Sequence, residues 1–322
     1  MSSSESNSVA LLNNLILQIN RYCAIFILLF GSIGNVLNIL VLSQRNLRSN
    51  PCIWYFLISS IVNLISIIFG LSTRLLSGWN KDLTETIDWL CKLRVFVVFC
   101  SRTIAFWLIM FATIDRWLLS SVNVHFRQLS KLKNSQRITF IVVLISCLIH
   151  IEMFYCYKAN LLNTPLKCYG RTELCRHLND LIYACITILL PIIFMLIFGL
   201  WTISNIHKTQ RRIRVENNEI RHNIRRNEQL LKKKRNRSLL KMLLVEVILL
   251  ILLIFPQAIQ KLHATITIYE NKSQYHQAID NFSYNCVLLL TFIASGIPFY
   301  IYTLCGGHVF RKALFNIFKC RP

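Results

Sequence analysis

The sequence predicts an all-α membrane protein built as a bundle of seven transmembrane helices. Its composition is the first indication: of 322 residues, 54% are hydrophobic and only 16% are charged, whereas a soluble domain has about 45–50% apolar and about 25% charged residues. The charge distribution is the second. The net charge of +22 is concentrated in short blocks between long uncharged runs, which argues against a nucleic-acid-binding protein despite the basic balance.

The lengths of the apolar runs give the number of spans. A spanning helix needs about 20 mostly apolar residues, because the hydrocarbon layer is about 30 Å thick and each residue rises 1.5 Å. Runs without any Asp, Glu, Lys or Arg occupy 22–44, 49–73, 181–207 and 281–310. Runs that carry a few ionisable groups occupy 93–118, 138–158 and 239–260. Backbone groups in lipid must satisfy their own hydrogen bonds, so helices are expected.

The basic loops predict the orientation. With the N-terminus outside, the first, third and fifth loops and the segment after the seventh span lie in the cytoplasm. These parts hold most of the Lys and Arg residues, as the positive-inside rule requires. We therefore expect an extracellular tail over 1–21, a bundle over 22–305 and a cytoplasmic segment over 306–322. The sequons at Asn271 and Asn281 then fall outside, where glycosylation occurs.

The twelve cysteines predict neither a metal site nor a disulfide framework. Most lie in apolar runs, where cysteine behaves as a small hydrophobe. Cys91, Cys168 and Cys175 lie on the outer side, in an oxidising environment, and one external disulfide is the simplest interpretation. No CxxC pair or His/Cys metal spacing occurs, and no cofactor is expected.

Several short motifs occupy defined positions in the predicted spans. Asp115-Arg116-Trp117 ends the third run on its cytoplasmic side, and Cys91 begins that run. Gly34-Asn35 lies in the first run, and Pro191 and Pro256 lie in the fifth and sixth. Together these residues resemble the rhodopsin-like (class A) G-protein-coupled receptors, which have an external cysteine and an Asp-Arg-Tyr triplet on the third helix.

The resemblance implies a plasma-membrane receptor that activates a heterotrimeric G protein through the cytoplasmic ends of helices 3, 5 and 6. Arg116 would face the G protein, restrained at rest by Asp115, and the prolines would kink their helices. Cys91 would pair with Cys175, which is slightly preferred, or with Cys168.

The resemblance also implies features near the cytoplasmic membrane surface. A short amphipathic helix would follow the seventh span, starting near Phe310, with Cys320 as a palmitoylation candidate. The basic loops would attract anionic lipids. The acid that often restrains the arginine from the sixth helix is replaced by Asn236.

Departures from the family pattern indicate a divergent branch, which we interpret as neuropeptide-receptor-like and orphan. Asn63 replaces the usual aspartate of span two, and the Asn-Pro-x-x-Tyr motif reads Ile297-Pro298-Phe299-Tyr300-Ile301-Tyr302, which leaves Tyr300 and Tyr302 as alternatives for its tyrosine. An opsin needs a Schiff-base lysine in span seven, and this span has no lysine. An amine receptor needs an acid midway along span three, and this span has none there. A peptide ligand is favoured by analogy.

The intramembrane charges allow two interpretations. Arg102 and Glu152 have similar predicted depths, so they form either a structural ion pair, which we slightly favour, or a ligand anchor at Arg102. Glu246 has no clear partner. The same three charges would suit the competing class, a transporter or channel, but the odd number of spans and the absence of a repeat argue against it; an enzyme is not expected. The candidate ligand-binding residues are Phe99, Arg102, Phe106, Gln257, Gln260 and Tyr284.

Overall fold

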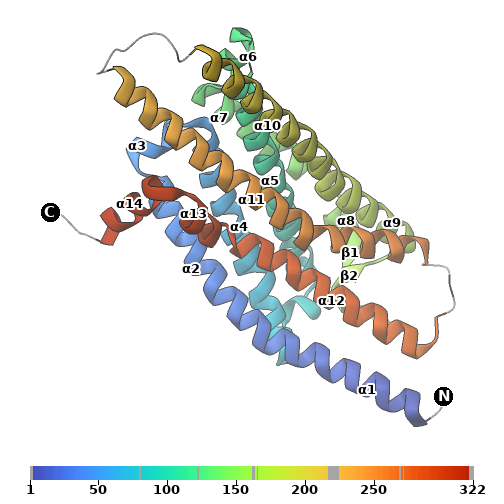
Figure 1. Cartoon of the computed structure of the whole chain (residues 1–322). Coiled ribbons are helices and arrows are strands. Elements are labelled where there is room, and N and C mark those ends of the chain that lie inside the picture. The colour runs from blue at the N-terminus through green and yellow to red at the C-terminus, as the bar shows by residue number, and fades with distance from the viewer. Residues whose placement is uncertain are drawn as a thin grey trace.

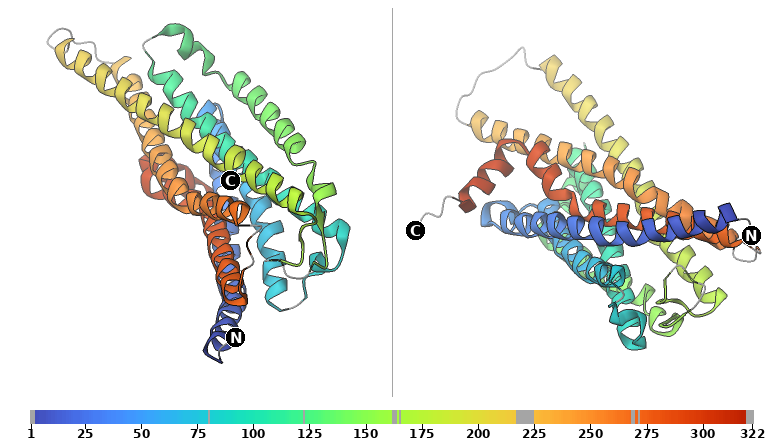
Figure 2. Two further views of the ribbon diagram at one scale, coloured as in Figure 1. Left: turned by 90° about the vertical axis from the view of Figure 1, so that its right-hand side faces the viewer. Right: turned by 90° about the horizontal axis from the view of Figure 1, so that it is seen from below.

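The computed structural model describes residues 3–79, 81–121, 123–161, 164, 166–216, 225–267, 270 and 272–318. It confirms the all-α fold class, with seven long apolar helices and a short helix after the seventh (Figure 1). The spans run side by side as tilted rods (Figure 2). Their bounds are Glu5–Leu42, Pro51–Gly78, Asp88–Ser120, Leu132–Cys156, Glu173–Lys208, Ser238–Ile266 and Gln274–Gly296.

Several spans consist of more than one helical element. The first joins α1 (Ser3–Gln18), the π-helical η1 (Ile19–Cys23) and α2 (Ala24–Leu42), and the second and third are α4 (Pro51–Gly78) and α5 (Asp88–Ser120). The remaining spans are built from α7 (Leu132–Ile149), α8 (Met153–Cys156), α9 (Glu173–Leu181), η3 (Ile182–Leu189), α10 (Leu190–Glu216), α11 (Arg225–Ile266), α12 (Gln274–Gly296) and α13 (Pro298–Cys305). The connections contain α3 (Arg45–Arg48), η2 (Leu83–Glu85), α6 (Val124–Leu129), β1 (Tyr157–Lys158) and β2 (Tyr169–Gly170), and the chain ends with α14 (Gly307–Phe318).

The observed helix ends follow from local chemistry and differ from the expected runs, as the first and last spans illustrate. The segment expected as an N-terminal tail is helical from Ser3. The run expected over 281–310 is divided, because Pro298 has no N–H to continue the ladder and instead begins α13. In α14, Phe310 and Ala313 are buried while Arg311 and Lys312 are exposed, which gives that helix its two faces.

Helix α5 forms the centre of the bundle. In its most apolar stretch 72% of the residues are buried, a larger share than in any other span, and it packs against α4, α7 and α10. Helices α2 and α12 cross closely at Gly31 and Gly296, where a Cβ atom on Gly296 would lie only 3.0 Å from the Cα atom of Gly31. Beside this crossing, Asn35 Nδ2 donates to the carbonyl of Ser295 at 3.0 Å.

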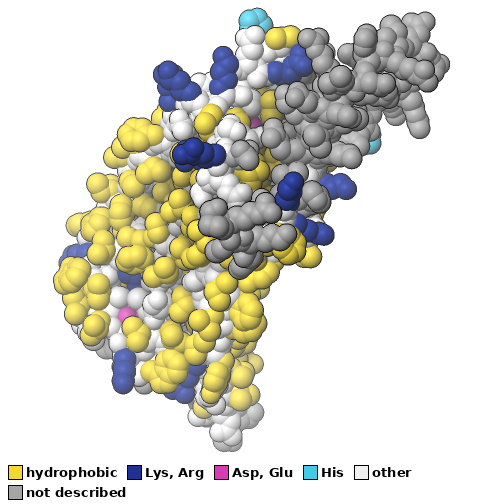
Figure 3. All heavy atoms as spheres, turned by 90° about the vertical axis from the view of Figure 1, so that its left-hand side faces the viewer, with side chains coloured by type: hydrophobic (Ala, Val, Ile, Leu, Met, Phe, Trp, Pro, Cys, Tyr) yellow, Lys and Arg dark blue, Asp and Glu magenta, His cyan; other side chains and the backbone are white. Residues whose placement is uncertain are grey.

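The outer surface is apolar over the middle of the molecule, as a lipid-facing surface must be. Figure 3 shows a broad hydrophobic band with most of the Lys and Arg side chains toward its two ends. Large apolar side chains are exposed on several spans, for example Phe140 (69%) on α7, Leu252 (64%) on α11 and Leu200 (65%) on α10. An exposed apolar area of this extent marks a membrane-embedded surface. The protein is a multi-pass membrane protein with seven spans.

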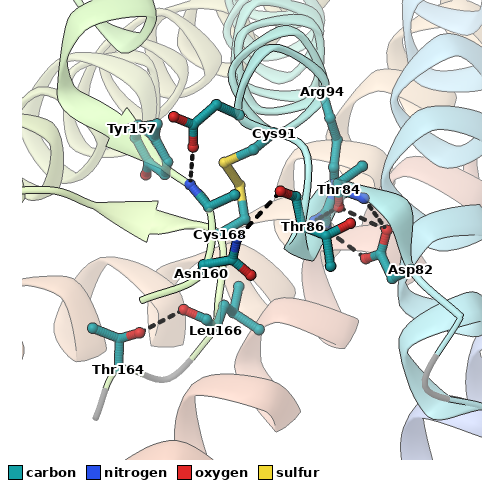
Figure 4. Close-up of a disulfide and its surroundings, with 12 residues drawn as sticks. Asp82, Thr84, Thr86, Cys91, Arg94, Tyr157, Asn160, Thr164, Leu166 and Cys168 are labelled. Carbon is teal, nitrogen blue, oxygen red and sulfur yellow. Dashed lines mark hydrogen bonds and ion pairs between the residues drawn. A yellow bond between two sulfur atoms is a disulfide. The ribbon is translucent and has the colours of Figure 1, made fainter. Parts of the chain in front are cut away.

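One end of the bundle, called here the disulfide end, carries α9 and a short hairpin in which Tyr157 pairs with Gly170 and Lys158 with Tyr169. The disulfide Cys91–Cys168 ties this hairpin to α5 (Figure 4). Asp88 of α5 also accepts a hydrogen bond from the backbone N–H of Ala159, at 2.8 Å.

The structure corrects the preference for Cys175 as the partner of Cys91. A second disulfide, Cys156–Cys175, connects α8 to α9, and the sequence analysis had not considered Cys156. Antiparallel pairing folds the chain after Cys156 back on itself, which brings Cys168 to the start of α5 and places Cys175 beside Cys156. Two disulfides therefore brace this end.

We expect peptide mapping of the unreduced protein to recover Cys91 linked to Cys168 and Cys156 linked to Cys175. Replacing Cys175 with Ser should make the Cys156 thiol reactive to maleimide while the other bridge stays intact. It should also lower the free energy of unfolding by about 2–5 kcal/mol, the usual effect of removing a native disulfide. Recovery of a Cys91–Cys175 peptide would contradict the observed pairing.

Candidate functional site

A cavity of about 500 Å³, partly open to solvent, lies at the disulfide end between α4, α5, α11 and α12 and beneath the hairpin. Its walls are mostly apolar and aromatic, with a few polar groups, as in small-ligand sites. The lining residues are Gly70, Arg74, Arg94, Val95, Val98, Phe99, Arg102, Tyr157, Leu166, Cys168, Tyr169, Gln257, Tyr284, Leu288 and Phe292. Three of them are arginines, and none is acidic.

Arg102 lies on α5 and is 1% exposed. Its Nη1 atom donates to the Tyr183 hydroxyl at 3.4 Å, and that hydroxyl donates in turn to Gln257 Oε1 at 3.4 Å. The Cζ atom of the guanidinium lies 4.1 Å from the ring centroid of Phe292, a cation–π distance. Within the described part of the chain, its Nε and Nη2 atoms have no hydrogen-bond partner.

Arg74 enters the same cavity from α4 and is 2% exposed. Its Nη1 atom donates to Asn285 Oδ1, and Asn285 is oriented by its own hydrogen bond to the Asn281 carbonyl at 2.7 Å. Among the residues the structure describes, the Nε and Nη2 atoms of Arg74 are also without a hydrogen-bond partner. Within the described residues, Arg74 and Arg102 thus each form a hydrogen bond to the protein through Nη1 alone.

The other cations near the cavity are paired. Arg94 lies 3.9 Å from Asp82 and 3.2 Å from the Thr84 hydroxyl (Figure 4). Lys261, buried behind Tyr169 and Tyr284, donates to Asp180 at 2.6 Å.

The hairpin tyrosines add hydroxyl groups but no charge. Burial raises the pKa of both Tyr157 and Tyr169, so both phenols stay protonated at neutral pH. Neither of them offsets the positive charge of the lining arginines.

The cavity brings together four of the six predicted ligand-binding residues: Phe99, Arg102, Gln257 and Tyr284. Phe106 instead lines a separate cavity of about 210 Å³ deeper in the bundle, together with Pro191. Gln260 is half-buried on α11 but is outside the lining of the ligand cavity.

Sequence reasoning missed two of the cavity arginines. Arg74 follows the uncharged run 49–73 directly, and Arg94 lies at the start of the run 93–118, and the sequence analysis assigned neither of them a role. Their position near the ends of adjacent spans was a usable signal, because neighbouring helices joined by a short loop bring such ends together.

The expected ion pair between Arg102 and Glu152 is absent among the described residues. Arg102 faces Tyr183 and Phe292, whereas Glu152 lies nearest His150, with 4.0 Å between Oε1 and Nδ1. Helix α7 ends at Ile149, and Glu152 lies in the turn before α8. The two side chains therefore do not face each other although their predicted depths are similar, because the helix is interrupted between α7 and α8.

At the opposite end of α5, the Arg116 end, the Asp115-Arg116-Trp117 triplet is anchored locally. Arg116 Nη2 donates to Asp115 Oδ2 at 2.6 Å and to Asn50 Oδ1 at 3.1 Å. Asp115 also accepts from the Ser130 hydroxyl at 2.5 Å. Both members of the ion pair are about 4% exposed.

The aromatic side chain of Trp117 connects α5 to its neighbours at this end. Its ring centroid lies 5.4 Å from that of Phe126 in α6, 5.0 Å from Phe198 and 5.8 Å from Trp201 in α10. Tryptophan here supplies packing area to both α6 and α10.

Span six is linked to α13 by a buried carboxyl group. The Tyr302 hydroxyl lies 3.0 and 2.9 Å from the two carboxylate oxygens of Glu246, and both residues are 1% exposed. Tyr300 is 37% exposed and donates to the Phe30 carbonyl. Of the two tyrosines left open by the sequence, Tyr302 is the one inside the bundle, and it supplies the partner that Glu246 lacked.

The remaining predicted residues have mixed placements. Pro256 lies inside α11, Pro191 is the second residue of α10 and Pro298 begins α13. Asn63 is buried and donates to Ser59 Oγ at 3.5 Å. Asn281 is half-buried within α12, while Asn271 and Cys320 lie outside the described residues. No cluster of metal-binding side chains occurs within the described ranges.

The model of the family "7 transmembrane receptor (rhodopsin family)" matches residues 34–314, which is most of the chain. The chain therefore belongs to the rhodopsin family of seven-transmembrane receptors: it is a class A G-protein-coupled receptor. Such receptors respond to an extracellular ligand, act on a G protein and are not enzymes. No curated protein shows a significant match to the chain.

The absence of the Arg102–Glu152 pair gives a direct test. We expect the double exchange Arg102→Glu with Glu152→Arg to fail to restore folding, because each side chain would face the other's unrelated surroundings. Glu152→Gln alone should change the unfolding temperature little, since neither carboxylate oxygen of Glu152 has a hydrogen-bond partner among the described residues. Thermal unfolding of the purified variants would measure this, and recovery of wild-type stability in the exchange variant would contradict the observed geometry.

Proposed function

We propose that this receptor binds its ligand, most favourably a peptide, in the cavity at the disulfide end, and activates a heterotrimeric G protein at the Arg116 end through α5, α10 and α11. In this proposal the N-terminus and the hairpin are extracellular, and the Arg116 end is cytoplasmic. The two disulfides support this orientation, because disulfides form in oxidising compartments. The basic loops support it through the positive-inside rule.

The single observation that carries the proposal is that α5 contributes to both sites. Arg102 lines the cavity, and Arg116 lies farther along the same helix, about 21 Å away at 1.5 Å per residue. The helix between them is largely buried and packs on α4 and α10. A ligand that displaces side chains around Arg102 therefore acts on the element that positions Arg116.

At rest, Arg116 is restrained from within its own end of the bundle. Its partners are Asp115 on the same helix and Asn50 at the start of α4. Among the described residues, no acid of α11 contacts it. Activation in this receptor therefore requires the guanidinium to leave Asp115 and Asn50.

The Glu246–Tyr302 contact is proposed as the second resting restraint. It joins the cytoplasmic half of α11 to α13, and Pro256 lies between Glu246 and the ligand cavity on α11. Because a proline weakens the ladder around it, the half of α11 that carries Glu246 can swing separately. Outward movement of that half would break the contact with Tyr302.

Further expectations belong to this proposal. The basic residues of the cytoplasmic loops favour anionic lipids of the inner leaflet. Cys320 remains a palmitoylation candidate, and Asn271 and Asn281 remain candidate glycosylation sites. In this proposal the ranges 1–21, 22–305 and 306–322 are the extracellular, membrane and cytoplasmic parts of the chain. The first boundary does not coincide with a helix end, since the helix of the first span begins at Ser3.

We expect Arg116→Ala to abolish ligand-stimulated G-protein activation, because it removes the guanidinium that faces the G protein. Cell-surface amount should stay close to wild type. The measurement is nucleotide exchange on purified G proteins, with a ligand found by screening. Arg48→Ala is the matched control, since Arg48 is an exposed arginine at the same end and its removal changes the charge equally. Unchanged signalling by Arg116→Ala would show that Arg116 only sets topology.

We expect Tyr302→Phe to raise ligand-independent nucleotide exchange severalfold. The change removes the hydroxyl that binds Glu246 but keeps the ring, which packs 4.9 Å from Phe56. Tyr300→Phe is the matched control, because its hydroxyl lies on the exposed side of the same helix. Basal exchange that stays at the wild-type rate in a folded Tyr302→Phe receptor would remove the restraint from the mechanism.

A further inference from the structure

We propose that the cavity at the disulfide end is selective for a carboxylate-bearing ligand, with the carboxylate bound by the free edges of Arg102 and Arg74. The proposal rests on the proposed function, which assigns the ligand to this cavity, and it adds the chemical class of that ligand. The expected ligand is a carboxylic acid with an apolar or aromatic body; for a peptide, this is a free C-terminal carboxylate next to an apolar residue.

The first argument is the geometry of the unused donors. In a guanidinium group, Nε–H and one N–H of Nη2 point in the same direction and form a fork that matches the two oxygens of a carboxylate. Both Arg102 and Arg74 bind the protein through Nη1 and leave Nε and Nη2 without a partner in the described part of the chain. Two buried arginines that line one cavity from different helices therefore each retain the same unpaired carboxylate-binding edge.

The second argument is charge. The lining contains Arg74, Arg94 and Arg102 and no Asp or Glu. The nearby acids are already used: Asp82 by Arg94, Glu85 by Lys167 and Asp180 by Lys261.

The groups that contact Arg102 and Arg74 directly are neutral, so these contacts do not compensate the charge of the two arginines. Arg102 has a tyrosine hydroxyl and an aromatic ring, and Arg74 has a neutral amide. A buried charge without a counter-charge is strongly destabilising, and an arginine at membrane depth costs at least about 2.5–3.5 kcal/mol. An anionic ligand would remove this penalty from both residues at once, whereas an amine ligand would increase it.

The third argument is the rest of the lining, which favours an organic acid over an inorganic anion. Val95, Val98 and Leu288 form aliphatic walls, and Phe99 and Tyr284 add aromatic surface. A ligand that places its carboxylate on the arginines would therefore bury an apolar group against these walls.

The test uses purified full-length receptor in lipid nanodiscs, without G protein, and pairs of probes that differ only in charge. The pairs are 4-phenylbutyrate with 4-phenylbutyramide, and N-acetyl-phenylalanine with N-acetyl-phenylalaninamide. Binding is measured by the shift in thermal unfolding temperature across a concentration series. We expect each acid to raise the unfolding temperature and each amide to act at least tenfold more weakly, because charge-assisted bidentate pairs are about twice as strong as neutral hydrogen bonds.

Two peptide libraries then distinguish the source of the carboxylate. One consists of tetrapeptides with free C-termini, and the other of the same tetrapeptides with C-terminal amides. Stronger stabilisation by free-acid tetrapeptides than by 4-phenylbutyrate assigns the site to peptides. The opposite order assigns it to small carboxylic acids, and either order supports the proposal.

Charge-preserving variants test the fork itself. Arg102→Lys and Arg74→Lys keep the positive charge but remove the parallel pair of donors, and we expect each to weaken acid binding about ten- to one-hundredfold. Arg171→Lys is the matched control, because Arg171 is exposed on the loop after β2 and lies outside the cavity lining. If either cavity variant does not fold, the acid–amide comparison on the wild-type receptor decides the question.

Three results would overturn the proposal: equal binding of acids and amides, equal binding by the lysine variants, or the same stabilisation by chloride or inorganic phosphate alone. Failure of the proposed function would look different. Acids would then bind to the wild-type receptor, but no ligand would promote nucleotide exchange on a G protein. Exchange driven only by neutral or cationic ligands would retain the receptor function and reject the carboxylate.

Discussion

Ionised side chains inside the bundle have to find partners in a medium that solvates charge poorly, and this requirement determines what each part of the receptor does. The Asp115–Arg116 pair at 2.6 Å and the Lys261–Asp180 pair at 2.6 Å meet it directly. The buried carboxyl group of Glu246 is hydrogen-bonded to the Tyr302 hydroxyl. Arg102 and Arg74 meet it only in part, because each leaves two guanidinium nitrogens without a partner among the described residues. In the proposed mechanism Arg116 and Glu246 restrain the resting bundle, whereas the two incompletely paired arginines line its cavity.

The architecture of the disulfide end preserves the incompletely paired state. Cys91–Cys168 fixes the hairpin above the cavity, and Asp82 is held near Arg94 by η2, where its Oδ1 atom caps Thr84 at 2.8 Å. Asp180 lies behind the hairpin tyrosines and binds Lys261. The acids that might have neutralised Arg74 and Arg102 are thereby committed to other cations, so the positive charge of the cavity is a consequence of the fold around it.

The sequence predicted the spans because lipid imposes a length and an apolar composition that single runs of residues reveal. It also predicted Arg102, Phe99, Gln257 and Tyr284 in the cavity, because depth along a helix follows from a constant rise per residue. Depth did not determine direction: Phe106 lies in a different cavity, and the turn after α7 separates Glu152 from Arg102. Rotation about a helix axis depends on packing between spans, which the sequence of one chain does not specify.

The pairing of residues far apart in the chain could not be predicted from the sequence either. The choice of Cys168 over Cys175 depends on a hairpin of only two residues per strand, too short to leave a pattern of alternating side chains. Arg74 was missed for a different reason, since a basic residue at the end of an apolar run ordinarily marks a membrane boundary. Its burial to 2% exposure arises from packing around Asn285 on a helix more than two hundred residues away in the chain.

The polar contacts of Arg102 provide a physical route between the cavity and α11. Arg102 on α5 contacts the Tyr183 hydroxyl of η3, which in turn contacts Gln257 on α11, and Gln257 directly follows Pro256. Both hydrogen bonds are 3.4 Å long, at the weak end of the range, so a stronger acceptor placed at Arg102 would compete with Tyr183 for the guanidinium. Release of Tyr183 would free Gln257 beside the proline inside α11. Glu246 lies on the same helix, on the other side of that proline. Binding of an anion at Arg102 would therefore weaken the Glu246–Tyr302 contact through movement of α11.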